Sequence, residues 1–318
     1  MSPGMRVSGL AVAAAIVLLV AVWIVTAPQT VPASALPPYV PNIENGRTMF
    51  AIGGCASCHA TPAADPDKVD RTRLGGGLAL RTPFGTFYVP NISPDAADGI
   101  GRWTEADFVT ALWTGTSPEG RHLYPAFPYT SYQHMRLADL RDLFAYLKTL
   151  PPISGRARRH DLAFPFNVRG LIGLWKLLFF HGGPFVPDDT KSAQWNRGAY
   201  LVIGPGHCAE CHSPRNILGA VIESARFAGG PVESGKGWAP NITPAGLRHA
   251  WADGGAWSQK DIASYLEDGI DPGGDFAGGA MTDVIRNTSL LSIADRAAIA
   301  AYIASLPSRQ GPKPPDKN

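Results

Sequence analysis

The pentapeptide Cys55-Ala56-Ser57-Cys58-His59 occurs again downstream in closely similar form, as Cys208-Ala209-Glu210-Cys211-His212. Cys-x-x-Cys-His is the attachment motif of c-type haem, in which both thiols form thioethers and the histidine binds the iron. The two motifs use all 4 cysteines of the chain, so the sequence offers no further pair to complete a zinc site. Two covalently bound haem c groups are therefore predicted. Their expected attachment residues are Cys55, Cys58, Cys208 and Cys211, with His59 and His212 as axial ligands of the iron.

The sequence around the two motifs is repeated as well. Pro90-Asn91-Ile92-Ser93-Pro94 follows the first motif, and Pro240-Asn241-Ile242-Thr243-Pro244 follows the second. Further along, Trp103-Thr104-Glu105-Ala106-Asp107 corresponds to Trp257-Ser258-Gln259-Lys260-Asp261. Matching order and spacing in separate blocks indicate two homologous modules in tandem.

Helix signals occur at matching places in both modules. Thr104 with Asp107, and Ser258 with Asp261, are the hydroxyl and carboxylate pairs of capping boxes at helix starts. With no strong strand signal beside them, these patterns predict an all-α fold of two tandem class I cytochrome c modules. Further helices are expected over about 44–52, 137–150 and 292–306.

An apolar segment precedes both modules. Residues 7–27 are a run of 21 mostly apolar residues after the single positive charge of Arg6. A helix of this length spans about 30 Å, the thickness of the hydrocarbon core of a bilayer. We expect a single-pass transmembrane helix in the cytoplasmic membrane, with the body on the periplasmic side. A cleaved signal peptide is the alternative, because Ala33-Ser34-Ala35 offers a cleavage site.

An apolar connector is expected between the modules. Arg169 and Lys176 interrupt it, so we do not expect it to span a membrane. Packing across both modules is the favoured role, and contact with a bilayer surface or with a protein partner are the alternatives. The expected segments are 1–35, an anchor and spacer or signal peptide; 36–152, cytochrome c domain 1; 153–192, the connector; 193–308, cytochrome c domain 2; and 309–318, a disordered tail.

Each iron needs a sixth ligand, and methionine is the usual one in electron-transfer cytochromes. Met281 is the only methionine after the second motif. The equivalent residue of the first module is Phe127, which cannot bind iron, and Met135 follows it eight residues later. We therefore expect Met135 and Met281 as the sixth ligands. His134 or an open iron are the alternatives in the first module.

Composition narrows the classes of function. Charged residues make up 17% of the chain and the formal net charge is +2, which argues against a nucleic-acid partner. The 35 glycines and 29 prolines indicate many loops. The sequence contains no glycine-rich phosphate loop and no Ser/His/Asp signature.

Several motifs give the chain a family resemblance over about residues 40–307. They include Thr82-Pro83-Phe84-Gly85-Thr86, the two Pro-Asn-Ile blocks, Gly99-Ile100-Gly101-Arg102-Trp103-Thr104 and Tyr124-Pro125-Ala126-Phe127-Pro128-Tyr129. With these motifs the chain resembles the membrane-bound cytochrome c subunits of periplasmic dehydrogenases. The chain departs from the alcohol and gluconate dehydrogenase subunits by having two haem motifs rather than three. Those subunits also commonly place methionine where Phe127 stands.

The resemblance implies a partner and a direction of electron flow. In that family a large dehydrogenase subunit oxidises an alcohol, aldehyde, sugar acid or N-heterocycle. It carries pyrroloquinoline quinone, flavin, or molybdenum with iron–sulfur clusters. The cytochrome subunit passes the electrons to a quinone, a soluble cytochrome or a terminal oxidase.

Two classes of function follow from these observations. The first is an electron-transfer subunit with no catalysis of its own. The second is a haem enzyme, such as a dihaem peroxidase or thiosulfate dehydrogenase, that uses an open first haem. The sequence has no third cysteine to act as a thiolate ligand and no acid–base cluster near the motifs. We therefore expect a carrier rather than an enzyme.

Overall fold

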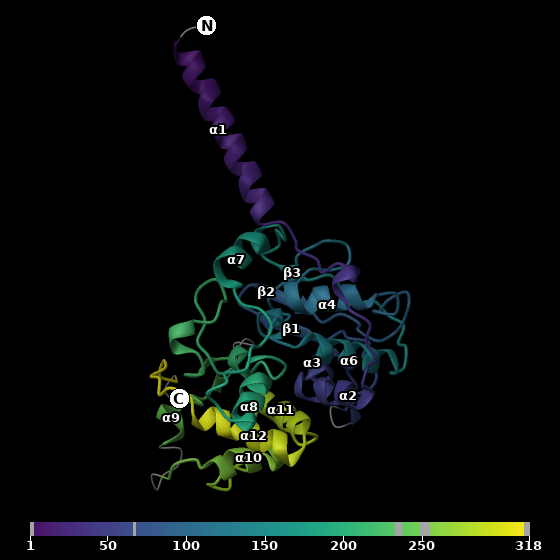
Figure 1. Ribbon diagram of the computed structural model, residues 1–318, viewed down its shortest axis with the longest axis vertical. Coiled ribbons are helices and arrows are strands. Elements are labelled where there is room, and N and C mark those ends of the chain that lie inside the picture. Colours follow the sequence, from purple (N-terminus) through teal and green to yellow (C-terminus); the bar gives the residue numbers. More distant parts are fainter. Residues whose placement is uncertain (1–2, 66–67, 233–236, 249–254, 315–318) are drawn as a thin grey trace.

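The computed structural model describes residues 3–65, 68–232, 237–248 and 255–314. Two helical modules lie against each other, with the connector along one side (Figure 1). The first module contains α2 (Ile43–Ile52), α3 (Cys55–His59), α4 (Glu105–Thr114), α5 (Tyr129–Tyr132) and α6 (Leu137–Lys148). The second contains α8 (Ala193–Ile203), α9 (Pro244–Leu247), α10 (Gln259–Asp268), α11 (Ala280–Thr288) and α12 (Ile293–Ala304).

The helix starts confirm the predicted capping. At α4 the Thr104 hydroxyl accepts from the Asp107 amide at 3.1 Å, and the Asp107 carboxylate accepts from the Thr104 amide at 2.9 Å. Ser258 and Asp261 form the same box at α10. At α12 the Asp295 carboxylate instead pairs with an arginine of α8 at 2.7 Å, so this cap also joins two helices. The repeated polar pattern therefore fixes where the helices begin.

In each module the first and last helices cross at a glycine. A Cβ on Gly46 of α2 would lie 2.1 Å from the Asp142 carbonyl oxygen of α6. A Cβ on Gly198 of α8 would lie 1.9 Å from the Ala298 carbonyl oxygen of α12. Only glycine allows the two backbones to approach so closely, and this crossing is the same in both modules.

Substitution of either glycine should be strongly destabilising. Gly46→Ala or Gly198→Ala forces the helices apart in a buried crossing, and overpacking of this kind costs about 3 kcal/mol. Gly170→Ala is the matched control, because a Cβ at that position would have nothing within 4 Å. Denaturant unfolding of the haem-loaded protein measures the loss. Equal stability of all three variants would contradict the close crossing.

Two small antiparallel sheets correct the expected all-α fold, which is wrong. β1 (Ala79–Thr82) pairs with β2 (Gly85–Tyr88), and β2 pairs with β3 (Asp161–Leu162) of the connector. β4 (Gly230–Pro231) pairs with β5 (Trp238–Ala239) in the second module. Strands of two to four residues are too short to show an alternating pattern, so periodicity could not reveal them. The mixed content is consistent with cytochrome c modules that carry small hairpins.

The N-terminal helix also requires a correction. α1 (Pro3–Val25) extends away from the body (Figure 1). Among the helices of the described residues, none has both the length and the apolar character needed to cross a bilayer. The expected single-pass anchor, and the expected location in the cytoplasmic membrane with a periplasmic body, are therefore wrong. That prediction rested on the length and apolar character of residues 7–27 in the sequence.

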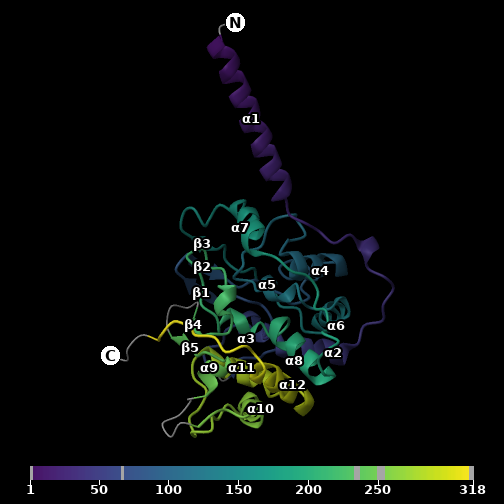
Figure 2. The ribbon, with the colours of Figure 1, turned by 60° about the vertical axis from the view of Figure 1, so that its left-hand side comes forward.

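The connector contacts both modules, as favoured from the sequence. Its helix α7 (Leu171–Phe179) lies beside the sheet of the first module (Figure 2). The Lys176 ammonium donates to the carbonyl oxygens of Thr114 and Gly115, at 2.6 and 2.7 Å, at the end of α4. The Trp175 indole donates to the Leu218 carbonyl oxygen of the second module at 2.9 Å. One helix thus ties the two modules together.

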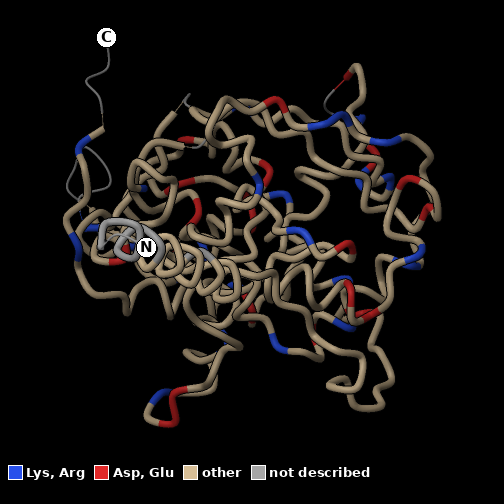
Figure 3. The backbone as a smooth tube through the Cα atoms, turned by 90° about the horizontal axis from the view of Figure 1, so that it is seen from above, with Lys and Arg blue, Asp and Glu red and all other residues tan. Residues whose placement is uncertain are grey.

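The segments before and after the modules also make specific contacts. The Val31 amide donates to the Thr110 hydroxyl at 2.9 Å, which places the expected spacer along α4. The Arg309 carbonyl oxygen accepts from the Asn241 amide group at 2.8 Å. Residues 315–318 of the expected tail lie outside the described residues. Figure 3 shows basic and acidic residues interspersed over the body, in keeping with the small net charge.

Candidate functional site

The two haem-attachment motifs lie on short helical turns that follow the first helix of each module. The first motif is α3, and the second begins with a 3₁₀ turn at Cys208–Glu210. None of the four cysteines, all within the described residues, forms a disulfide. Burial raises the pKa of Cys55 and of Cys208 to about 12, so before haem is attached both groups are protonated thiols at neutral pH.

The histidine of each motif is held by a proline carbonyl group. Nδ1–H of His59 donates to the Pro90 oxygen at 2.8 Å, and Nδ1–H of His212 donates to the Pro240 oxygen at 2.8 Å. A carbonyl oxygen only accepts, so Nδ1 carries the hydrogen and Nε2 keeps its lone pair. Burial lowers the pKa of His59 to about 4 and also lowers that of His212. A neutral imidazole with a free Nε2 and a fixed ring is the form that binds iron, so the residues fit haem c.

The asparagine after each proline fixes this carbonyl group in place. The Asn91 side-chain oxygen accepts from the Ser93 amide at 2.9 Å, and the Asn241 oxygen accepts from the Thr243 amide at 2.8 Å. These contacts show that the asparagines brace their own turns. The Asn91 amide group also donates to the Ile153 carbonyl oxygen at 2.6 Å, beyond the last helix of the module. Each turn is thereby tied to the end of its own module.

The structure places the two predicted methionine ligands differently. Met135 is buried, with 1% of its surface exposed, and its carbonyl oxygen accepts from the Trp113 indole at 2.9 Å. Met281 is the second residue of α11 and is partly buried against the core. The ring centroids of Phe127 and Tyr132 lie 5.5 Å apart, a packing contact typical of a core residue.

His134, the alternative ligand, is held by the connector. Its Nδ1–H donates to the Gly183 carbonyl oxygen at 2.7 Å, and its own carbonyl oxygen accepts from the Phe185 amide at 3.0 Å. These bonds fix the ring against residues 181–185. The bond to Gly183 leaves Nε2 of His134 free, as at His59, while the neighbouring Met135 carries a soft thioether deep in the core.

The two motifs meet at the boundary between the modules. His207 precedes Cys208 and occupies a left-handed backbone conformation, with φ 38°, where the first module has Gly54 with φ 60°. A left-handed histidine is strained, and its Nε2–H donates to the Gly53 carbonyl oxygen at 3.2 Å. The Tyr132 hydroxyl donates to the same oxygen at 3.0 Å. Gly53, two residues before the first haem motif, is therefore hydrogen-bonded to His207, the residue before the second motif.

Sequence reasoning predicted the cysteines and histidines but missed these partners. The proline carbonyl groups could have been found, because Pro90 and Pro240 occupy the same place in a repeated block. His207 gave no signal, since a glycine stands at the equivalent position. Contacts between modules join residues that no local pattern relates.

Comparisons with known proteins agree with this site. The family model for cytochrome c matches residues 43–151. A dihaem c-type cytochrome of Cereibacter sphaeroides is 52% identical over 266 residues, which are 83% of this chain and 86% of the relative. A nicotinate dehydrogenase subunit of Pseudomonas putida is 42% identical over 83% of this chain and 21% of its own length. The fructose dehydrogenase cytochrome subunit of Gluconobacter japonicus is 36% identical over 88% of this chain and 55% of its own length.

These relatives confirm the resemblance inferred from the motifs. The chain spans most of the first relative, about a fifth of the second and about half of the third. The predicted pair of covalently bound haem c groups is confirmed, and so is the role of an electron-transfer component rather than a catalytic subunit. The chain belongs to the cytochrome c family, among the dihaem cytochromes related to the cytochrome subunits of dehydrogenases.

Proposed function

We propose that this chain carries electrons from the catalytic subunit of a dehydrogenase through two haem c groups to an acceptor. The observation that supports it best is the repeated histidine geometry. His59 and His212 both donate Nδ1–H to a proline carbonyl oxygen at 2.8 Å and both keep Nε2 for a metal. Haem c supplies one-electron oxidation and reduction when it is bound.

The residues of each module divide into anchors and iron ligands. The thiols would anchor the haem, and the fixed neutral imidazoles would bind the iron. In the first module the anchors are Cys55 and Cys58 and the histidine is His59; in the second they are Cys208, Cys211 and His212.

We assign the second protein ligand of each iron to a methionine, which would be Met135 in the first module and Met281 in the second. The burial of Met135 in the core supports the first assignment. The position of Met281 at the start of α11, where it packs against the core, supports the second. A thioether favours reduced iron. It also has no proton to lose, so transfer of an electron would not require the methionine to gain or release a proton.

The partner and the acceptor follow from the family. The catalytic partner is a dehydrogenase of the molybdenum, quinoprotein or flavin type, and the acceptor is a quinone, a soluble cytochrome or a terminal oxidase. The named relatives belong to nicotinate and fructose dehydrogenases. We also propose the division into domains at 36–152 and 193–308, with 153–192 as the connector that holds them together.

Reduction by a dehydrogenase substrate tests this function. The tagged chain is purified from its own cells together with bound proteins and is supplied with nicotinate, fructose, ethanol or gluconate. We expect one substrate to reduce both haems in the complex, seen in the visible spectrum, and no substrate to reduce the isolated chain. Direct reduction of the isolated chain by a substrate would contradict the role of carrier. So would haems that stay oxidised in a complex whose dehydrogenase turns over.

A further inference from the structure

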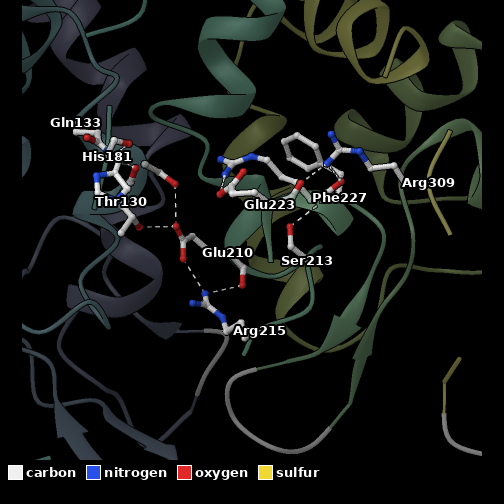
Figure 4. Close-up of polar contacts among 11 residues, drawn as sticks. Thr130, Gln133, His181, Glu210, Ser213, Arg215, Glu223, Phe227 and Arg309 are labelled. Carbon is white, nitrogen blue, oxygen red and sulfur yellow. Dashed lines mark hydrogen bonds and ion pairs between the residues drawn. The ribbon is translucent and has the colours of Figure 1, made fainter. Parts of the chain in front are cut away.

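Glu210, inside the second haem motif, bonds to the first module (Figure 4). One carboxylate oxygen accepts from the Thr130 hydroxyl at 2.8 Å and from the Ser131 hydroxyl at 2.9 Å, both in α5. The other oxygen pairs with the Arg215 guanidinium at 2.7 Å. A largely buried carboxylate, paired with an arginine, therefore holds a helix of the other module.

The first haem motif has the reciprocal contact. Ser57 stands in the first motif where Glu210 stands in the second, and its hydroxyl accepts from the Asn287 amide group at 3.0 Å. Asn287 lies in α11 of the second module. Arg71 of the first module also hydrogen-bonds to Asn287 and lies 3.6 Å from the Asp283 carboxylate of α11.

The helices held in this way are the ones that lead to the proposed sixth ligands. Met281 lies within α11. Met135 lies three residues after the end of α5, and its amide donates to the carbonyl oxygen of Tyr132, the last residue of α5, at 2.9 Å. Each ligand-bearing segment therefore contacts the haem motif of the other module, and α5, with only four residues, has little internal hydrogen bonding to hold it alone.

We infer that the modules position each other's iron ligands: Glu210 of the second haem motif holds Met135 over the first haem, and Ser57 with Arg71 of the first module holds Met281 over the second. Glu210 and Arg71 are positioning residues, since neither is proposed to touch iron. The inference rests on the proposed methionine ligands. It predicts that a substitution of Glu210 changes methionine binding at the first haem, and that a substitution of Arg71 changes it at the second.

Displacement of methionine by imidazole tests this reciprocal positioning in the full, haem-loaded chain. In a Met281→Leu parent, the methionine–iron charge-transfer band reports the first haem alone. Adding Glu210→Ala should lower the imidazole concentration that removes half of this band by about tenfold, because charge-assisted hydrogen bonds are lost. In a Met135→Leu parent, Arg71→Ala should have the same effect on the band of the second haem.

Two further variants guard against a general loss of structure. Thr130→Val with Ser131→Ala removes the donors from the α5 side with little change in volume and should reproduce the Glu210→Ala result. Glu223→Ala is the matched control, because Glu223 pairs with Arg226 at 2.8 Å in a pocket that Glu210 also lines. It should leave the band of the first haem unchanged.

The outcomes separate this inference from the ligand assignment. If the Met281→Leu parent has no charge-transfer band, the assignment of Met135 fails and the reciprocal positioning fails with it. If the band is present but Glu210→Ala does not change the imidazole concentration that removes half of it, the reciprocal positioning alone is overturned. An equal effect of Glu223→Ala would also overturn it, since the effect would then not depend on the contact between Glu210 and α5.

Discussion

Met281→Leu should abolish the methionine–iron charge-transfer band of the second haem and lower the reduction potential of that haem. Leucine has a similar volume, so the change removes the sulfur with little loss of packing. A thioether stabilises reduced iron, and axial ligands set haem potentials over a range of about 0.8 V. The band and the potential of the first haem should be unchanged. Visible absorption of the oxidised protein and a spectroscopic redox titration measure both effects.

Met135→Leu should do the same at the first haem, independently. Met49→Leu is the matched control, because Met49 is a fully buried core methionine of α2. It should leave both bands intact. If Met135→Leu leaves the spectrum unchanged while His134→Ala alters it, the first iron is bound by two histidines and the assignment of Met135 is wrong.

Removal of the second pair of cysteines should halve the number of covalent haems. With Cys208→Ala and Cys211→Ala combined, no thioether can form in the second module, while Cys55 and Cys58 still hold the first haem. Mass spectrometry of the denatured chain should show two haems on the native protein and one on this variant. Each single substitution leaves one thiol and should weaken attachment rather than prevent it.

The control for this experiment is the reciprocal pair, Cys55→Ala with Cys58→Ala. It should also retain one haem, attached to a peptide that contains Cys208 and Cys211. A native chain with one haem or none would contradict the presence of two attachment sites. Loss of both haems in either double variant would show that the modules do not load separately.

The helical framework could be predicted because its signals are local. Capping pairs such as Thr104 with Asp107 act within one turn, so they are visible in the sequence and recur in both modules. The hairpin β1–β2 could not be predicted, since four-residue strands carry no clear alternation. The apolar run over 7–27 predicted a membrane span, but no helix of the described residues qualifies as one.

The site divides in the same way. The anchoring cysteines and the histidines are predicted from five consecutive residues, so the motif alone is enough to propose them. The hydrogen-bond partners of residues in the motifs lie far away in sequence. Pro90 is 31 residues from His59, and Thr130 is 80 residues from Glu210. Such pairs form only when the chain has folded. The repeat of Pro90 at Pro240 was the only sequence signal that pointed to one of them.

Carbon monoxide binding tests most directly whether this chain carries electrons or performs chemistry at an open haem. Carbon monoxide is added to the fully reduced, haem-loaded protein and the visible spectrum is followed. An iron that already holds histidine and methionine has no free position, so the predicted result is an unchanged spectrum at both haems. Rapid formation of a carbon monoxide adduct at the first haem, together with turnover of peroxide or thiosulfate, would contradict the role of carrier and identify a haem enzyme.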